Sequence, residues 1–343
     1  MYEVQFLTEQ YFKIFKGVYE DFKLKSKSDF KFELEPLDYI DFIGAFEKKL
    51  INCLILLEDG IPTAFLAYST EENMAIELYL IHCIGNVDLE NKASALVKFF
   101  LENTENIRDK RIVSYPMLGV QKKYQNVLKS YGFDFVDIGV MSFDIESKEK
   151  RKNFLDNFDK TLPIGFSIVP YSKQYFDEVS IVINSAFESS NDAKYDERFL
   201  TITGSIDIQN KTITSIYGKF IDEASSILLY ENKVVGFTFV NIIGRNIANI
   251  TLVGIAPEFR GQKLSTPLIG YTLRELIKLY DDFNVDIANL NVSVDLSNLS
   301  AYNMYKKAGF KETYMYPQAY LQKIERIVPA ETEEEVEWKT KII

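Results

Sequence analysis

The sequence predicts a mixed α/β protein made of two tandem domains, each with a mixed, mostly antiparallel twisted sheet flanked by helices. With 343 residues the chain is too long for one ordinary domain and suits two of about 150 residues. Hydrophobic residues make up 47% of it, enough for a core in each half, which excludes a disordered or fibrous chain. The same order of strand and helix patterns also occurs twice.

The C-terminal half shows this order most clearly. We expect strands at Phe166–Val169, Ser226–Tyr230, Val234–Ile243, Ile247–Ile255 and Ala288–Leu296, and a last strand pair within Phe310–Gln322. We expect helices at Phe176–Phe187, Leu264–Asp282 and Leu299–Ala308. Glu231-Asn232-Lys233 is interpreted as a three-residue hairpin loop. Pro267 is tolerated only in the first turn of a helix, so the long helix should begin near Ser265.

The N-terminal half repeats the order with little residue identity. Its expected elements are a hairpin of Cys53–Leu57 and Thr63–Tyr68, strands Ile76–Ile84 and Ile112–Ser114, and helices Asn91–Glu102 and Tyr124–Ser130. Tyr131-Gly132-Phe133 then matches Ala308-Gly309-Phe310 in the other half. An internal duplication explains both halves.

A charged stretch over residues 146–165, ending in Pro163 and Gly165, indicates the boundary between the domains. We therefore expect domains at residues 1–146 and 166–325, joined by a linker at 147–165. Residues 326–343 form an acidic tail that we expect to be solvated, with Trp338 as its one possible anchor.

The net charge of −11 argues against a nucleic-acid partner, which needs a basic patch, and mildly favours cationic partners such as amines. Cys53 and Cys83 lie in apolar segments and are expected to be buried and reduced. His82 is the single histidine, so we expect no metal site and no Ser-His or Cys-His catalysis, and interpret it as a satisfied core residue.

The first 22 residues lack the apolar core typical of a signal peptide, and no apolar run approaches the roughly 20 residues of a transmembrane helix. We expect a cytoplasmic protein with no membrane partner, either a monomer or a homodimer.

The segment from Gly254 to Ser265 predicts a strand that turns into a helix. Unpaired N–H groups and the helix dipole make such a turn an anion site suited to a pyrophosphate. Alone, an Arg-Gly turn before a helix is more often a plain connection.

A second segment, one strand later, changes that interpretation. It has the pattern N-x-x-A-x-x-x-Y-x-K-x-G-F, formed by Asn298, Ala301, Tyr305, Lys307, Gly309 and Phe310. Together the two segments resemble the Gcn5-related N-acetyltransferases (GNAT), whose first motif is V-x-P-x-x-R-G-x-G-x-G/A after a strand. The resemblance covers about residues 166–325. Without it, Tyr305 would be interpreted as core, because it shares a helical stripe with Ala301 and Ala308.

The resemblance implies acetyl-CoA as cosubstrate. Its pyrophosphate would bind backbone N–H groups of a turn comprising Arg260, Gly261, Gln262, Lys263, Leu264 and Ser265. The strand backbone at Val253, Gly254 and Ile255 would pair with the pantetheine arm and polarise the acetyl carbonyl. Asn298 would contact that arm, and Tyr305 would protonate the leaving thiolate.

Lys263 stands where the family usually has Gly, and Ser265 where it has Gly or Ala; we expect CoA binding to be retained. The general base is not identified. Candidates on polar strand faces or in the early helical region are Asn249, Asn291, Ser293, Asp295, Glu188 and Asp192, each more often a structural or solvated residue. Asp295 is the least weak of them.

The N-terminal half lacks these features. Residues 85–91 contain no Arg-Gly pair, Asp88 and Glu90 would repel a pyrophosphate, and Leu128 stands in place of Tyr305. We expect this half not to bind CoA, and instead to pack against the other half and shape the acceptor cleft.

The resemblance predicts transfer of acetyl to a primary amine of a small molecule or peptide by direct attack. Two alternatives stay open: a transferase with another acyl donor, as in mycothiol-synthase-like enzymes, and a catalytically silent CoA-binding or regulatory module.

Overall fold

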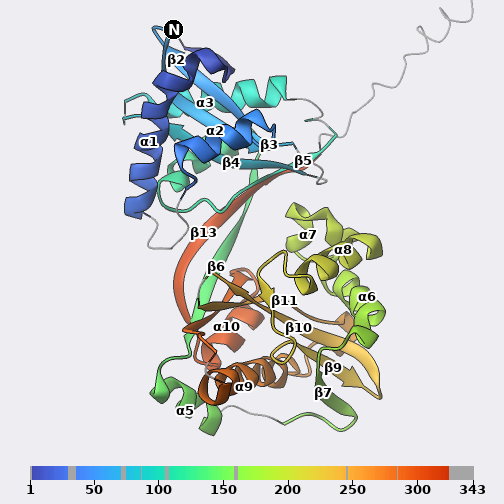
Figure 1. Cartoon of the computed structure of the whole chain (residues 1–343). Coiled ribbons are helices and arrows are strands. Elements are labelled where there is room, and N and C mark those ends of the chain that lie inside the picture. The colour runs from blue at the N-terminus through green and yellow to red at the C-terminus, as the bar shows by residue number, and fades with distance from the viewer. Residues whose placement is uncertain are drawn as a thin grey trace, which may run out of the picture.

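The computed structural model describes residues 2–29, 36–70, 75–85, 87–104, 107, 109–157, 161–244, 246–283 and 285–323. Within them, strands form one continuous sheet in the order β1-β2-β3-β4-β5-β13-β6-β12-β11-β10-β9-β7, with β8 beside β10. Helices cover both faces, so the mixed α/β prediction is confirmed (Figure 1). The expected acidic tail at 326–343 lies outside the described residues.

The N-terminal half forms the upper part of the molecule in Figure 1. Its strands are β1 (Glu3–Phe6), β2 (Asn52–Glu58), β3 (Ile61–Ser69), β4 (Ala75–Cys83), β5 (Arg111–Ser114) and β6 (Asp134–Asp144). Its helices are α1 (Phe12–Asp29), α2 (Tyr39–Glu47), α3 (Leu89–Asn103) and α4 (Gln125–Ser130), with 3₁₀ turns η1 (Glu9–Tyr11) and η2 (Gly119–Tyr124).

The C-terminal half has the corresponding order of elements. Its strands are β7 (Phe166–Pro170), β8 (Lys219–Phe220), β9 (Ser226–Tyr230), β10 (Lys233–Ile243), β11 (Ile247–Ile255), β12 (Asn289–Asp295) and β13 (Lys311–Leu321). Its helices are α6 (Phe176–Phe187), α7 (Asp192–Tyr195), α8 (Ile202–Ile213), α9 (Ser265–Phe283) and α10 (Leu299–Lys307), with 3₁₀ turns η3 (Lys173–Tyr175), η4 (Glu197–Leu200) and η5 (Pro257–Phe259).

Two local expectations were wrong. The β9–β10 hairpin has a two-residue loop, because Glu231 and Asn232 both adopt positive φ (47° and 66°), the conformation of a tight hairpin turn. The expected last strand pair is the single long strand β13, which pairs with β6 over most of its length and leaves no room for a turn.

The last strands of the two halves are exchanged in the sheet. Strand β6, from the N-terminal half, pairs with β12 from Asn289↔Asp144 to Asp295↔Ile138. Strand β13, from the C-terminal half, pairs with both β5 and β6. Each half therefore contributes its last strand to the part of the sheet formed by the other half.

The expected linker contains a further helix, α5 (Lys148–Asn157), which packs on the C-terminal half. Arg151 Nη2 lies 3.0 Å from Asp281 Oδ1, and Phe154 is buried against Phe143 of β6. The division of the chain at 147–165 stays a prediction.

Each half has a core on both faces of its sheet. In the N-terminal half, α1 and α2 cover one face, and α3 and α4 the other. In the C-terminal half, α9 and α10 cover one face, and α6 and α8 the other. Strand β11 thus lies between two helical layers.

The single histidine lies in the N-terminal core. His82 is 0% exposed, and its Nε2 is 2.9 Å from Asp21 Oδ2. Its Nδ1 is buried and has no hydrogen-bond partner within the described ranges, so one ring nitrogen is satisfied. Burial lowers the pKa of His82 to about 4, which keeps the ring neutral at pH 7. Cys53 and Cys83 are buried and free.

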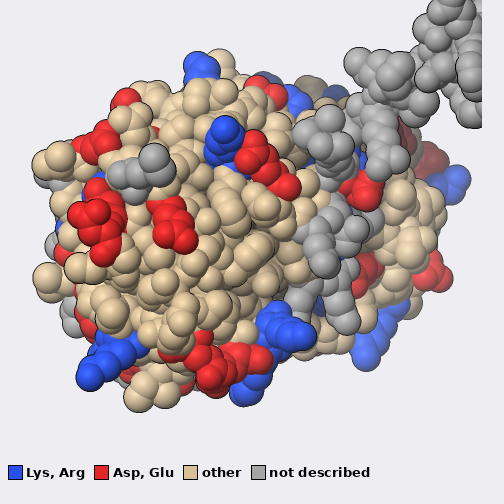
Figure 2. Space-filling view, turned by 90° about the horizontal axis from the view of Figure 1, so that it is seen from above, with Lys and Arg blue, Asp and Glu red and all other residues tan. Residues whose placement is uncertain are grey.

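No helix in the described part of the chain has the length and apolarity to span a membrane. On the face seen in Figure 2, Lys and Arg are interspersed with Asp and Glu and form no continuous patch among the coloured residues.

The strand exchange makes the C-terminal half dependent on β6. We expect a fragment of residues 166–343 to fail to fold cooperatively, because it lacks Met141 and Phe143, both buried in the core under α9. A fragment of residues 133–343 retains β6 and α5 and should show a cooperative melting transition by circular dichroism. A cooperative transition in the shorter fragment would contradict this dependence.

Candidate functional site

Strands β11 and β12 separate along their length and leave a wedge. They pair in parallel only from Ile247↔Asn289 to Ile250↔Val292. Beyond that point β11 stays paired with β10 as far as Ile255, and β12 stays paired with β6 as far as Asp295. One edge of β11 is consequently left without a neighbouring strand.

The backbone groups on this edge can be identified from the pairing of β11 with β10. Ala256 N donates to Val235 O at 2.9 Å, so hydrogen-bonded pairs alternate from there along the antiparallel ladder. The N–H and C=O groups of Val253 and Ile255 therefore point away from β10, into the wedge. Among the described residues, the Ile255 carbonyl accepts from Arg260 Nε at 3.1 Å, and neither the Val253 groups nor the Ile255 N–H has a partner. A ligand with amide groups would pair with this edge like an added strand.

Gly254 lies between these two residues and faces α6. A Cβ atom there would come within 2.9 Å of the Phe237 ring and 3.2 Å of Ala186 Cβ. The glycine thus permits close packing of α6 on β11, beside the free edge.

The loop after β11 contributes further backbone N–H groups, of which that of Arg260 already donates to Pro257 O at 3.2 Å. Gly261 and Lys263 have positive φ values of 79° and 60°, and residues 260–263 are exposed. Leu264 is 1% exposed and anchors the loop in the core, and α9 begins at Ser265 with no acidic residue in its first turn. This geometry fits the predicted anion site.

Two residues of the loop have roles that the motif alone does not reveal. The Arg260 guanidinium donates to Ile255 O and to Ala186 O, the latter at 2.7 Å, so it ties the loop to β11 and to α6. Lys263 adopts the left-handed conformation that glycine takes without strain, at a cost of about 1–2 kcal/mol. The departure from the family motif therefore changes the side chain and leaves a glycine-like backbone.

The second motif lies on α10. Asn298 is exposed and caps the helix, its Oδ1 accepting from Ala301 N at 3.1 Å. Tyr305 is 2% exposed and packs on Phe310, with ring centroids 5.3 Å apart, in a core cluster that Val253 also contacts. Burial raises the pKa of Tyr305 well above its usual value. Tyr305 is thus a core residue on the wedge side of β12, and its catalytic role stays a prediction.

The opposite face of the sheet is polar near the wedge. Asn249 pairs with Asn291 one residue before the strands separate, and Asn291 Oδ1 is buried without a partner within the described ranges. Asp295 accepts from Asn191 Nδ2 at 2.6 Å and from both Ser297 N and Oγ, so its carboxylate is already occupied.

The remaining candidates for the general base are either already hydrogen-bonded or exposed. Asp192 accepts from Tyr195 OH at 2.6 Å, and Glu188 and Ser293 are exposed. No motif indicates Tyr316, the partly buried tyrosine on β13 opposite Ile138, whose pKa burial raises to about 12. No group of three or more His, Cys, Asp or Glu side chains in the described residues is arranged to hold a metal ion.

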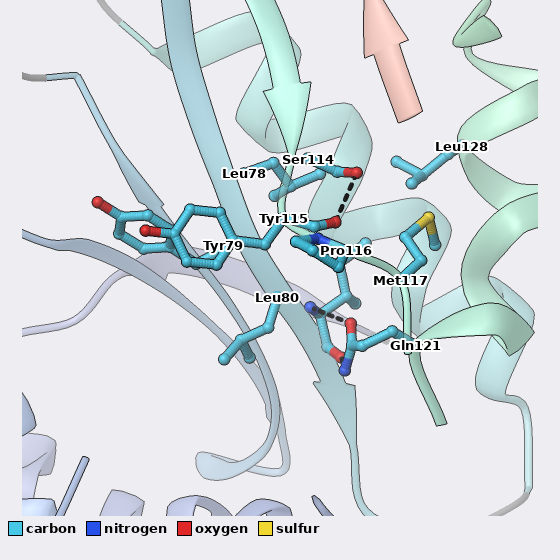
Figure 3. A pocket seen from close by; sticks show the side chains of 10 residues that line it. Leu78, Tyr79, Leu80, Ser114, Tyr115, Pro116, Met117, Gln121 and Leu128 are labelled. Carbon is cyan, nitrogen blue, oxygen red and sulfur yellow. Dashed lines mark hydrogen bonds between the residues drawn. The ribbon is translucent and has the colours of Figure 1, made fainter. Parts of the chain in front are cut away.

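The N-terminal half contains a matching wedge that its own side chains fill. Strands β4 and β5 pair only from Ala75↔Arg111 to Leu78↔Ser114, while β4 continues to Cys83. Gln121, on η2, accepts from Ile81 N at 3.1 Å and donates to Ile81 O at 2.9 Å (Figure 3). The Tyr124 hydroxyl accepts from Cys83 N at 3.0 Å.

These plugging residues have counterparts in the other half. When the two Gly-Phe turns are aligned, Gln121 corresponds to Asn298 and Tyr124 to Ala301. The small Ala301 leaves open the space that Tyr124 occupies. Both residues are visible in the sequence, but their role in closing the wedge can be recognised only once the wedge is known.

The anion site also differs between the halves. Asp88 has φ 58°, precedes α3, and accepts hydrogen bonds from Tyr2 OH and Asn91 Nδ2. Its carboxylate occupies the position where the C-terminal half presents exposed N–H groups.

Gln121→Ala should destabilise the protein by about 2 kcal/mol, because it leaves the N–H and C=O of the buried Ile81 unpaired. Chemical denaturation measures this loss. Lys122→Ala, at the adjacent exposed position, is the matched control and should change the free energy of unfolding by less than about 0.5 kcal/mol. Equal effects of the two variants would contradict the plugging role of Gln121.

Comparison with known proteins agrees with this geometry. Residues 193–310 match the model of the acetyltransferase (GNAT) family. No curated protein matches the sequence.

Solved structures share the whole fold at low identity. A GCN5-related N-acetyltransferase from Sphaerobacter thermophilus is 12% identical with a TM-score of 0.59, over 94% of this chain and 95% of that one. A tandem GNAT protein from the clavulanic acid biosynthesis pathway, solved without AcCoA, is 11% identical with a TM-score of 0.50, over 94% and 99% of the chains. The family match shows a GNAT domain within the C-terminal half, and the solved structures show that the chain as a whole has a tandem GNAT fold.

Proposed function

We propose that the protein transfers the acetyl group of acetyl-CoA to a primary amine of a small molecule or peptide by direct attack. The observation that carries this proposal is the unpaired edge of β11 at Val253 and Ile255, which leads to a loop of exposed N–H groups. The N-terminal half has the same wedge but closes it with Gln121, so the open wedge is specific to the C-terminal half.

The pantetheine arm has amide groups that match the free edge. Its amides would pair with Val253 and Ile255 as an added strand, and the pyrophosphate would lie on the N–H groups of residues 260–265. Asn298 uses its Oδ1 to cap α10, which leaves its Nδ2 to contact the arm. The Lys263 side chain is exposed beside the same loop and adds a positive charge.

In the proposed reaction the amine nitrogen attacks the thioester carbonyl carbon, and the C–S bond breaks as the C–N bond forms. The N–H of Val253 would stabilise the developing oxyanion. Tyr305 would give its proton to the departing thiolate. The phenol of Tyr305 is protonated at neutral pH, as a proton donor must be, and burial raises its pKa further.

The acceptor would approach from the polar face of the sheet. The buried, unpaired Oδ1 of Asn291 is suited to accept a hydrogen bond from an amine N–H at the point where β11 and β12 separate. The net charge of −11 favours the approach of a cationic amine. Since Asp295 and Asp192 already accept hydrogen bonds, we propose that water takes the amine proton.

A second candidate is a CoA-binding protein without transferase activity. The 2% exposure of Tyr305 and the engaged carboxylates favour it. A transferase with a longer acyl donor is the third. Turnover measured with acyl-CoAs of increasing chain length, against a panel of amines, separates the three: acetyl alone, a longer acyl group, or no thiol release despite binding.

Tyr305→Phe should lower kcat by about 100-fold or more, while the Kd for acetyl-CoA changes less than about twofold, because only the proton donor is removed. Tyr302→Phe is the matched control: Tyr302 lies on the same helix but is solvent-facing, its OH bonded to Glu312 Oε2 at 3.0 Å. Steady-state thiol release and calorimetry give the two quantities. Unchanged kcat in Tyr305→Phe would remove this residue from the mechanism.

Lys263→Gly and Lys263→Val separate the charge of this residue from its backbone conformation. Lys263→Gly should bind acetyl-CoA within about fivefold of the original protein, since one exposed charge is worth at most about 1 kcal/mol. Lys263→Val removes the same charge but disfavours a φ of 60°, so its affinity should be about tenfold weaker than that of Lys263→Gly. Equal affinities of the two variants in calorimetry would show that the left-handed backbone is not needed.

A further inference from the structure

A short segment of the C-terminal half, residues 186–197, crosses the open end of the wedge. At β11, Arg260 Nη2 donates to Ala186 O at 2.7 Å. At β12, Asn191 Nδ2 donates to Asp295 Oδ2 at 2.6 Å and to Ser297 Oγ at 3.2 Å. The segment therefore links the loop that follows β11 to the end of β12, across the point where the two strands diverge.

The far end of this crossing segment is held by the N-terminal half. Arg111, on β5, is 6% exposed. Its Nε donates to Glu197 Oε1 at 2.9 Å, and its Nη1 donates to Ala193 O at 2.6 Å. The Glu197 side chain is 11% exposed, so this ion pair is largely desolvated, and loss of Glu197 would leave the buried Arg111 charge without its carboxylate.

The exchanged strand β13 adds two contacts to the same segment just beyond its end. Lys323 Nζ lies 3.1 Å from Glu197 Oε2, and Gln322 Nε2 donates to Lys194 O at 3.0 Å. The Tyr195 ring packs with Val136 and Tyr320 in a cluster on β6 and β13. The segment thus rests on the strands that the exchange brings together.

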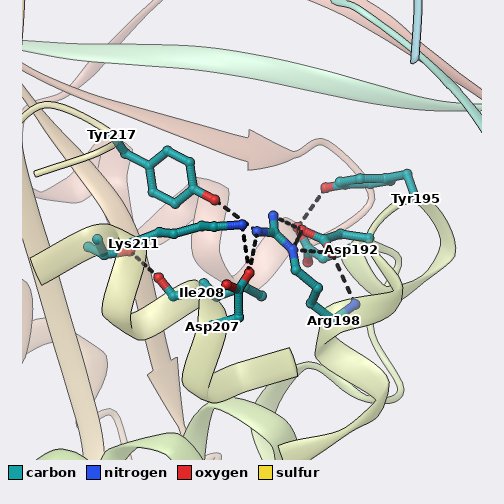
Figure 4. Close-up of polar contacts among 9 residues, drawn as sticks. Asp192, Tyr195, Arg198, Asp207, Ile208, Lys211 and Tyr217 are labelled. Atoms are coloured by element: carbon teal, nitrogen blue, oxygen red, sulfur yellow. Dashed lines mark hydrogen bonds and ion pairs between the residues drawn. The ribbon is translucent and has the colours of Figure 1, made fainter. Parts of the chain in front are cut away.

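A polar network within the C-terminal half fixes the chain immediately after this segment. Arg198 pairs with Asp196 at 2.6 Å and with Asp207 at 3.1 Å, and donates to Tyr217 OH at 2.9 Å (Figure 4). These contacts tie η4 to α8. Arg111 ties the crossing segment to β5 of the other half by hydrogen bonds, in addition to the packing of Tyr195 on Val136 of β6.

We infer that Arg111 is a positioning residue through which the N-terminal half, although its own wedge is plugged, holds the crossing segment in place for acceptor binding. The inference rests on the proposed function for the identity of the acceptor site. It assigns the N-terminal half a role in acceptor recognition and none in binding acetyl-CoA. Arg111 acts through the Ala193 carbonyl and Glu197, and touches no substrate itself.

The test compares Arg111→Met with Lys92→Met in the full-length protein. Lys92 is also 6% exposed and pairs with Glu58 at 2.6 Å, and its helix α3 packs mainly on β1 to β4 and α4 of the N-terminal half. Both variants remove a buried cation from an ion pair, so both should lower the melting temperature, although Glu58 is more exposed than Glu197 (36% against 11%). Glu197→Gln, which keeps the side-chain size and removes the charge, serves if Arg111→Met does not fold.

Arg111→Met should raise the KM for the amine about tenfold, with kcat within about threefold and the Kd for acetyl-CoA within about twofold of the original values. Hydrogen exchange in peptides covering residues 186–197 should become at least about tenfold faster. Lys92→Met should change neither the KM for the amine nor the exchange rate of residues 186–197. Arg111→Lys keeps the charge but not both contacts, and should give an intermediate KM.

The inference would be overturned if hydrogen exchange in residues 186–197 were equal in Arg111→Met and Lys92→Met. It would also be overturned if both variants raised the KM for the amine equally. The exchange measurement does not depend on activity. If the original protein neither binds acetyl-CoA nor releases thiol, the proposed function fails, and the exchange result still decides whether Arg111 holds the segment.

Discussion

The backbone hydrogen-bonding groups along the edge of a buried strand need partners, and this requirement organises both halves of the protein. Where β4 leaves β5, the side chains of Gln121 and Tyr124 supply the partners, and the wedge is closed. Where β11 leaves β12, the corresponding positions are Asn298 and Ala301, and the groups of Val253 stay unpaired among the described residues. The same fold thus has one strand edge whose backbone groups are paired and one whose groups are free. A ligand with amides would gain the most hydrogen bonds at the free edge.

The exchange of β6 and β13 makes the two halves one structural unit. It extends the sheet without a break, so that Arg111 of β5 comes to lie against Glu197, close to the wedge of the other half. The N-terminal half, whose own wedge is plugged, completes the sheet beside β12 and contacts the segment that crosses the wedge. The C-terminal half therefore carries the open wedge, and the N-terminal half supports the segment beside it.

The open site combines strain with rigidity. Lys263 holds a left-handed backbone, and Asn291 leaves a buried oxygen unpaired, both of which cost stability. Arg260 and Leu264 fix the loop on either side of Lys263, through hydrogen bonds to the backbone and through burial in the core. The surrounding contacts thus keep the loop and the strand edge in place before any ligand binds.

Local patterns in the sequence determined much of this picture. Periodicity alone located α6 and β11 to the residue, and the two motifs placed the loop at 260–265 and Tyr305 on either side of one strand. Other features had no local signal, because the partner of a strand edge is chosen in space. Nothing in residues 134–144 indicates that they pair with residues 289–295 rather than within their own half. The closure of one wedge by Gln121, and the support of the other by Arg111, arise only when segments far apart in the chain are packed together, so the tertiary structure decided them.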